Sequence, residues 1–276
     1  MYKDYFGLKE EPFNVTPDPR FIYFSRKHRD AFSSLLYGIQ SRKGFVQLTG
    51  EIGAGKTTLC RAFLEKIRTE TKTALILNPQ ISENSMLKTI ADDFGISVKG
   101  DSRKACFDAL NAFLLAEFHR GNNCVLIIDE AQTLSAKALE QIRLLSNVET
   151  DREKLIQIVL IGQPELKETL KCRSLAQLRQ RIAIRFHLTA LDREEVHEYI
   201  RHRLTVAGLP KGLSTPFTPE ALDFIYEKTG GVPRLINNLS NTCLLAAYGR
   251  SFYGGLAQVD GNVAEDAYNE LEGIAV

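Results

Sequence analysis

The chain has 276 residues, of which 44% are hydrophobic and 25% charged, close to the averages of soluble globular proteins. This composition excludes a disordered, collagen-like or disulfide-dense protein, and the length allows a large domain plus a small one without metal or disulfide cross-links. The 35 basic and 34 acidic residues give a net charge of +1, which disfavours non-specific coating of nucleic acid but leaves room for a local basic patch.

The five cysteines stand singly and form no Cys-x-x-Cys pair, so we expect reduced core thiols in a cytoplasmic protein. The first residues, Met1 to Tyr5, lack the basic start and apolar run of a signal peptide. No stretch approaches the roughly 18 apolar residues of a membrane span. We therefore expect a cytoplasmic chain with no direct insertion into a membrane.

The chain begins with a segment rich in proline and aromatic residues, and a helical pattern follows from Ser25 to Gly44. We expect residues 1–43 to form an extended segment and a first helix that pack on the core through aromatic rings. Residues 44–190 then alternate between helices and apolar runs, which lie at 45–48, 74–77, 125–128, 155–161 and 184–188. Runs without polar alternation are typical of strands buried on both faces, so this part is predicted to be an α/β domain with a mostly parallel five-stranded sheet.

After Leu188 the strand signal ends. Four helices are predicted, at 192–207, 218–229, 233–248 and 261–272, and turn signals rich in glycine and proline separate them. The sequence therefore predicts a small, all-helical domain over residues 191–276.

A glycine-rich motif of the type G-x-x-x-x-G-K-[ST] follows the first predicted strand and precedes a helix, which is the context that a phosphate-binding loop requires. Its residues are Gly50, Glu51, Ile52, Gly53, Ala54, Gly55, Lys56 and Thr57, and Thr58 follows in the helix. Glycines let the backbone N–H groups surround phosphates at a helix N-terminus. Lys56 then supplies a positive charge to the β- and γ-phosphates of ATP, and Thr57 a hydroxyl ligand for Mg²⁺.

Polar residues follow the third and the fourth of the five apolar runs. Asp129 and Glu130 follow the run at 125–128, and Gln163 follows the run at 155–161. Ligands of parallel sheets lie at the carboxyl ends of the strands, so we expect Asp129 to hold Mg²⁺, largely through water, and Glu130 to polarise the attacking water. Gln163 is a candidate to orient that water, and the alternative for Gln163 is a plain turn residue.

Two arginine sites complete the candidate residues. Arg179 and Arg181 come just before the last predicted strand, and Arg234 follows a Gly-Gly-Val-Pro turn at the start of a helix. A guanidinium near a γ-phosphate neutralises charge that develops in the transition state. We expect Arg234 to act within the chain and Arg179 or Arg181 to act on a neighbouring subunit, with a solvated surface role as the alternative for each.

The order of these motifs resembles that of an AAA+ ATPase: a phosphate loop, an acidic strand end, a polar strand tip, arginines before the last strand, and a Gly-x-Pro-Arg in a trailing helical lid. In this resemblance Arg234 would hold the sensor 2 position of the lid. Further motifs narrow the resemblance to the general secretion pathway protein A family. They are Phe6-Gly7-Leu8, Pro12-Phe13, Thr16-Pro17-Asp18-Pro19-Arg20-Phe21, Tyr37-Gly38-Ile39, Leu48-Thr49-Gly50-Glu51, Asp129-Glu130-Ala131-Gln132, Gly162-Gln163-Pro164-Glu165-Leu166 and Gly231-Val232-Pro233-Arg234-Leu235-Ile236-Asn237. Gln163 stands where many AAA+ proteins have asparagine.

The resemblance implies a bacterial module that hydrolyses ATP with Mg²⁺, oligomerises, and couples to a protein partner in type II secretion or another envelope-export machinery, if necessary as a peripheral inner-membrane protein. Larger members of the family continue into a membrane span and a periplasmic domain, so this chain is either a short member or a piece of a longer protein. An alternative comes from transposition target-selection ATPases, which are similar in motif order and use ATP to form filaments on DNA. The near-neutral charge disfavours that alternative. A nucleotide-binding scaffold with little turnover is a third possibility.

Overall fold

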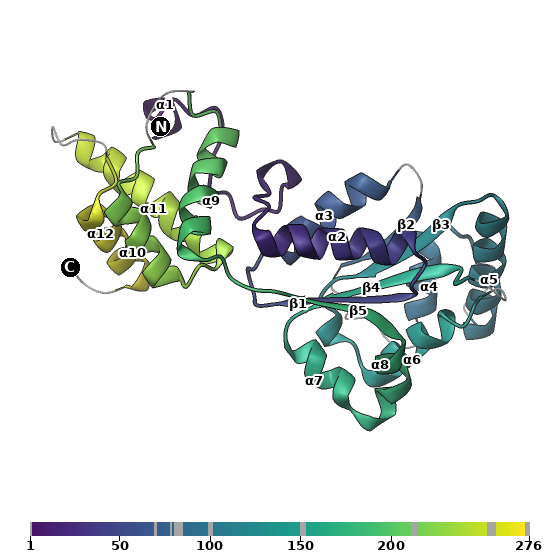
Figure 1. Cartoon of the computed structure of the whole chain (residues 1–276). Helices are drawn as coiled ribbons and strands as arrows, with labels where there is room; N and C mark the ends of the chain where they lie inside the picture. The colour runs from purple at the N-terminus through teal and green to yellow at the C-terminus, as the bar shows by residue number, and fades with distance from the viewer. Residues whose placement is uncertain are drawn as a thin grey trace. The chain divides into compact units, whose positions relative to one another are not determined.

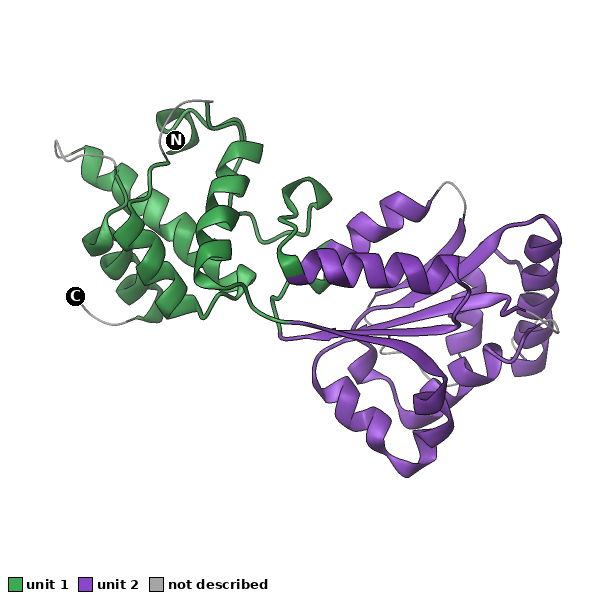
Figure 2. Ribbon diagram, in the orientation of Figure 1, with its two compact units in different colours: residues 1–26, 52–58, 189–276 green, residues 27–51, 59–188 purple. Residues whose placement is uncertain are grey.

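In the computed structural model, the residues whose placement is defined are 2–68, 71–77, 79, 85–98, 102–149, 153–210, 215–252 and 258–273. The chain forms two compact units (Figure 2). The first, here called the helical unit, consists of residues 1–26, 52–58 and 189–276. The second, the α/β unit, consists of residues 27–51 and 59–188.

A five-stranded sheet forms the centre of the α/β unit (Figure 1), and all four ladders between its strands are parallel. The strand order is β2-β3-β4-β1-β5. The bounds are Phe45–Gly50 for β1, Thr71–Ile76 for β2, Asn123–Ile128 for β3, Ile156–Gly162 for β4 and Ile182–Leu188 for β5. The predicted α/β fold with its parallel sheet is therefore confirmed. Strands β1, β3 and β4 are buried almost throughout, as their uninterrupted apolar runs require.

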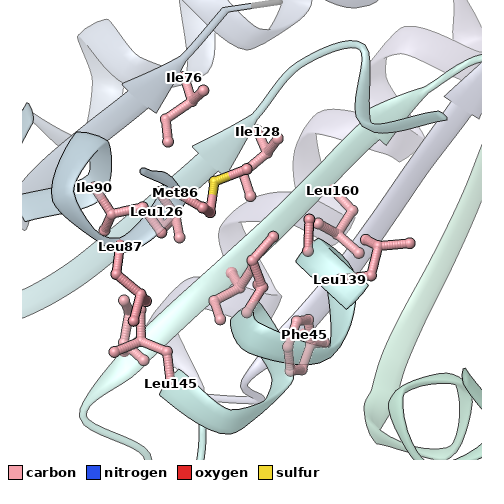
Figure 3. Close-up of a cluster of buried hydrophobic side chains, with 14 of the residues drawn as sticks. Phe45, Ile76, Met86, Leu87, Ile90, Leu126, Ile128, Leu139, Leu145 and Leu160 are labelled. Atoms are coloured by element: carbon pink, nitrogen blue, oxygen red, sulfur yellow. The ribbon is translucent and has the colours of Figure 1, made fainter. Parts of the chain in front are cut away.

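Helices cover both faces of the sheet (Figure 1). They are α2 (Arg26–Gln40), α3 (Lys56–Ile67), α4 (Met86–Asp93), α5 (Arg103–His119), α6 (Ala136–Leu145), α7 (Glu165–Lys171) and α8 (Ala176–Arg181), with short 3₁₀ turns η2 (Ala131–Thr133) and η3 (Arg173–Leu175). On one face, Met86 and Leu139 belong to a cluster with Leu126 and Leu160 of the sheet (Figure 3). On the other face, α2 packs closely because Gly38 has no side chain, and a Cβ there would lie 2.6 Å from Cγ2 of Val46.

The helical unit contains the four helices expected after the sheet. Their bounds are Arg193–Val206 for α9, Pro219–Thr229 for α10, Pro233–Ser251 for α11 and Gly261–Glu272 for α12, and the N-terminal segment adds α1 (Tyr2–Tyr5) and the 3₁₀ turn η1 (Pro19–Phe21). Local capping fixes these helices: α9 begins with a capping box between Asp192 and Glu195, and Thr218 and Asp260 cap α10 and α12. Buried side chains from all four helices form one core.

The N-terminal segment differs from expectation in the surface that it contacts. Phe13 and Phe21 belong to the core of the helical unit rather than to that of the α/β unit. The buried guanidinium of Arg203, in α9, donates hydrogen bonds to the carbonyl oxygens of Pro12 and Asn14 and lies over the ring of Phe21. Residues 1–26 therefore group with residues 189–276, and the expected N-terminal region of residues 1–43 is divided after residue 26.

Four of the five cysteines are buried, as expected of core thiols, and they are Cys60, Cys106, Cys124 and Cys243. The fifth, Cys172, is exposed, because it lies in the short connection between α7 and η3 rather than on the inner face of a helix. The expectation of a core position was wrong for this residue.

Candidate functional site

The glycine-rich motif connects β1 to α3. Strand β1 ends at Gly50 and helix α3 begins at Lys56, so Lys56 and Thr57 occupy the first turn of a helix, whose N–H groups have no partner within the helix. Gly53 and Gly55 have φ angles of +78° and +91°, in the region that glycine enters without strain. Gly50 is required for a different reason, because a Cβ there would lie 2.7 Å from the carbonyl oxygen of Leu188 in the neighbouring strand β5.

The motif also contacts the start of α11 within the helical unit. The backbone N–H of Arg234 donates a hydrogen bond to the carbonyl oxygen of Gly53 at 3.2 Å. A Cβ on Gly53 would lie only 2.5 Å from Cβ of Arg234. The backbone of Arg234 thus lies against Gly53 of the glycine-rich motif.

A turn with two left-handed glycines sets the position of Arg234. Gly230 ends α10 with φ +56°, and Gly231 follows with φ +74°. A Cβ on Gly231 would lie 1.9 Å from the carbonyl oxygen of Leu191, whose N–H donates to the oxygen of Gly231 at 2.9 Å. No other residue fits there without backbone movement, so the Gly-Gly-Val-Pro sequence fixes the direction in which α11 starts.

Asp129 and Glu130 lie at the carboxyl edge of the sheet, directly after β3. The N–H of Asp129 donates to the carbonyl oxygen of Ile76 at 2.9 Å and so continues the pairing of β3 with β2. Burial and the nearby charge of Asp129 raise the pKa of the Cys60 thiol to about 12. Lys56 precedes Cys60 by four residues and lies on the same face of that helix.

Glu130 has a strained backbone. Its φ and ψ angles are 53° and 35°, a left-handed conformation that costs a residue with a side chain on the order of 1–3 kcal/mol. Asp129 and Glu130 both follow the last strand residue, Ile128, so the alternation of side chains along a strand does not separate their carboxylates. The left-handed conformation of Glu130 changes the direction of the backbone after Asp129, so the two carboxylates have different surroundings.

Two amide side chains hold the Glu130 carboxylate. Its Oε2 accepts hydrogen bonds from Nε2 of Gln132 at 2.5 Å and from Nε2 of Gln163 at 3.2 Å. The oxygen of Gln132 in turn accepts a hydrogen bond from the backbone N–H of Gln163 at 3.0 Å. Gly162 leaves room for this network, because a Cβ there would lie 2.7 Å from Oε1 of Gln132. Gln163 is thus a direct partner of Glu130 across adjacent strands β3 and β4.

Gln132 is a site residue to which the sequence motifs assigned no role. It belongs to the Asp-Glu-Ala-Gln run that was used for the family resemblance, but no motif rule gave it a role. Its signal in the sequence was its position two residues after Glu130, which becomes meaningful only because η2 turns its side chain back toward the strand ends.

Arg179 and Arg181 lie away from this group. Helix α8 ends at Arg181, immediately before β5 begins at Ile182, so both residues lie at the amino edge of the sheet. The seven residues of β5 span about 20 Å between that edge and the edge that carries Glu130. Nη1 of Arg181 donates to Oγ of Ser146 at 3.2 Å and to Oδ1 of Asn147. Within one α/β unit these arginines and Glu130 are therefore separated.

The strand order, the phosphate loop and the acidic strand end together define a P-loop nucleotide-binding protein of the AAA class. An AAA domain family matches residues 39–170, and general secretion pathway protein A of Aeromonas hydrophila is 45% identical over 275 residues, which is 99% of this chain and 49% of that protein. The chain belongs to the AAA+ family of general secretion pathway protein A, and spans about half the length of that relative.

Solved structures share the fold at low identity. The ORC2 protein of Aeropyrum pernix, in ADPNP and ADP complexes, has a TM-score of 0.67 and 18% identity over 95% of this chain and 72% of its own. RuvB of Thermotoga maritima has a TM-score of 0.56 and 16% identity over 90% of this chain and 70% of its own. Among the residues that the structure describes, no helix combines the length and apolar character of a membrane span.

Proposed function

We propose that this chain is a Mg²⁺-dependent ATPase that couples ATP binding and hydrolysis to the assembly of a secretion or envelope-export machinery. The observation that carries the proposal is the network at the carboxyl edge of the sheet, where two amides hold the carboxylate of Glu130 beside Asp129. The identity to general secretion pathway protein A supports the assignment to secretion.

The residues of the phosphate loop would bind and orient ATP. Its glycines turn backbone N–H groups toward phosphate oxygens, Lys56 provides a charge to the β- and γ-phosphates, and Arg234 reads the γ-phosphate from the helical unit. Lys56 and Arg234 would both contact the γ-phosphate, which ADP lacks, so the site is expected to bind ATP more tightly than ADP.

The donors around the phosphate loop fit Mg²⁺. The hydroxyl of Thr57 and the carboxylate of Asp129 are oxygen ligands, which Mg²⁺ prefers, and Mg²⁺ keeps several waters and substrate phosphates in its shell. No cluster of three or more His, Cys, Asp or Glu side chains suited to a metal occurs in the described part of the chain. When bound, the ion supplies charge neutralisation at the phosphates.

Glu130 would orient and polarise the attacking water. A carboxylate acting as a general base must be ionised and held in a fixed direction, and the amides of Gln132 and Gln163 donate to the ionised form. Because both amides use Oε2, they hold one oxygen and fix the plane of the carboxylate. Arg179 or Arg181 of a neighbouring copy would neutralise transition-state charge, so turnover is expected to require self-assembly.

The test is steady-state ATP hydrolysis with Mg²⁺, compared between the wild type and Glu130→Gln. The isosteric amide cannot polarise water, so ATP affinity should persist while turnover falls by roughly 100-fold or more. Glu168→Gln, which changes an exposed carboxylate on α7 of the same unit, is the matched control and should hydrolyse ATP at the wild-type rate. Wild-type turnover in Glu130→Gln would remove Glu130 from the proposal.

The same assay distinguishes the DNA-dependent alternative. Hydrolysis that rises with protein concentration and ignores added double-stranded DNA supports a self-assembling, secretion-type ATPase. Strong stimulation by DNA that disappears at high salt would instead assign the chain to the transposition-like class, because phosphate contacts depend steeply on ionic strength.

A further inference from the structure

A groove on the α/β unit runs along helix α6, beside the first turns of α5 and the start of α4. It consists of two adjoining cavities of about 480 Å³ and 320 Å³ that share Arg103 and Gln141. Leu87, Phe107 and Leu144 give the larger cavity an apolar wall. None of these residues belongs to the phosphate loop or to the network of Glu130.

A buried amide in this groove has an unsatisfied oxygen. The side chain of Gln141 is 7% exposed, and its Oε1 has no hydrogen-bond partner in the described part of the chain. A buried acceptor without a partner is costly, and Gln141 lines both cavities. The groove therefore offers a hydrogen-bond acceptor at the junction of its two halves, and an occupant that brings an N–H donor would satisfy it.

The charge at the mouth of the groove is positive. Arg103 and Lys104 are exposed at the start of α5 and line the larger cavity, and Lys137 lines the smaller one. Among the residues that line the two cavities, Glu140 is the acidic one, and its charge is already paired, because both of its oxygens accept hydrogen bonds from Arg143 at 2.7–2.9 Å. An occupant with carboxylates is therefore favoured over a basic one.

We propose that this groove binds a short, extended acidic segment of a partner protein. An apolar side chain of the segment enters the cavity beside Phe107 and Leu144, a carboxylate pairs with Arg103, and a backbone N–H donates to Oε1 of Gln141. The ten residues of α6 are about 15 Å long, which matches four or five extended residues. A fatty acid would supply the apolar and anionic parts but has no N–H donor, so the amide favours a peptide.

The test is fluorescence anisotropy with a labelled pentapeptide of sequence Glu-Leu-Asp-Phe-Glu, blocked at both ends, titrated with the whole chain. We expect saturable binding, with a dissociation constant in the range of about 10–100 µM, weakened at high salt. A peptide with lysine in place of each acid, and one with alanine in place of leucine and phenylalanine, should each bind at least tenfold more weakly.

Three variants separate the groove from non-specific attraction. Gln141→Leu replaces the unsatisfied amide with an apolar side chain of similar size, so the fold should persist while peptide affinity falls at least fivefold. Arg103→Glu should abolish binding of the acidic peptide. Lys66→Ala removes an exposed cation on α3 of the same unit and should leave affinity unchanged. Thermal melts and ATP hydrolysis of each variant establish that it is folded.

Several outcomes would overturn the proposal. Equal binding of the acidic and basic peptides, no binding of the acidic peptide by the folded wild type, or wild-type affinity in Arg103→Glu would each do so. Saturable binding of decyl phosphate in place of the peptide would assign the groove to an anionic amphiphile. Loss of self-association in Arg103→Glu, measured by sedimentation velocity, without peptide binding by the wild type would assign it to a second copy. None of these results depends on turnover, so they leave the proposed ATPase function independently testable.

Discussion

The two edges of the parallel sheet are built from the same strands but use their polar residues differently. At the amino edge, Gln157 accepts a hydrogen bond from the N–H of Gly44 at 2.7 Å, Asn123 donates to the carbonyl oxygen of Ile39 at 2.9 Å, and Arg42 pairs with Glu153 at 3.3 Å. These contacts tie the start of β3, the start of β4 and the segment before β4 to the end of α2 and to the connection between α2 and β1.

At the carboxyl edge, the side chains of Glu130, Gln132 and Gln163 form hydrogen bonds with one another rather than with the ends of helices. Gln132 and Gln163 both donate to Glu130, whose backbone is left-handed. Ligands of parallel sheets bind at the carboxyl ends of the strands, which is the edge where this network lies. The comparison teaches that polar residues at the amino edge mainly stabilise this fold, whereas those at the carboxyl edge are candidates for chemistry.

The largest effect is expected for Lys56→Ala, which deletes the lysine of the phosphate loop beyond the carboxyl end of β1. ATP affinity should fall by about 100-fold or more, equivalent to at least about 2.7 kcal/mol, because the terminal phosphates lose their point charge. Isothermal titration calorimetry measures this. Lys43→Ala, which changes an exposed lysine two residues before the same strand, is the matched control, and equal affinities in the two variants would contradict the assignment of the loop.

Arg181→Ala tests one of the two candidates, Arg179 and Arg181, that lie at the amino edge. If Arg181 acts on a neighbouring copy, ATP binding should be unchanged while turnover falls by roughly 100-fold. Mixing this variant with Glu130→Gln should restore activity, because each lacks a different half of a shared site. No recovery on mixing, together with wild-type activity that is independent of protein concentration, would return Arg181 to a structural role with Asn147.

A pair of glycine variants compares the two edges directly. Gly162→Ala should displace Gln132, whose oxygen lies 2.7 Å from the added Cβ, and lower turnover by about tenfold with little change in melting temperature. Gly44→Ala, at φ +83° but with 3.6 Å to the nearest side-chain atom, should cost roughly 1–2 kcal/mol of stability and leave turnover unchanged. The opposite pattern in melts and hydrolysis rates would break the comparison.

The smallest effect concerns Glu117, beside the start of β3. Hydrogen bonds from Asn122 and Arg120 lower the pKa of its carboxyl, and burial opposes them. A lowered carboxyl pKa stabilises the fold above the pKa of the unfolded chain, about 4.3, and this contribution is lost as the pH falls through the lower folded value. Glu117→Gln should therefore lower the melting temperature at pH 7 and have a smaller effect near pH 3. Equal effects at both values would show that ionisation of Glu117 does not contribute.

The sequence alone determined the elements whose causes are local. The glycine spacing from Gly50 to Gly55 predicts a phosphate loop because the φ angles and the helix start lie within a few residues of one another. The apolar runs predict the five strands, and the capping residues and turns predict the four helices of the helical unit, because those signals act over one or two turns. Asp129, Glu130 and Gln163 could be placed at strand ends for the same reason.

Only the tertiary structure decided which of these ends meet. Gln163 reaches Glu130 from 33 residues away because β4 pairs with β3, and no local pattern specifies a strand order. Gln132 acquired its place through the left-handed turn at Glu130. The first 26 residues joined the helical unit because the guanidinium of Arg203, 189 residues beyond Asn14, binds their carbonyl groups. Contacts between distant residues depend on packing and on buried hydrogen bonds that the complete fold creates, so they follow from the three-dimensional arrangement rather than from any segment of the chain.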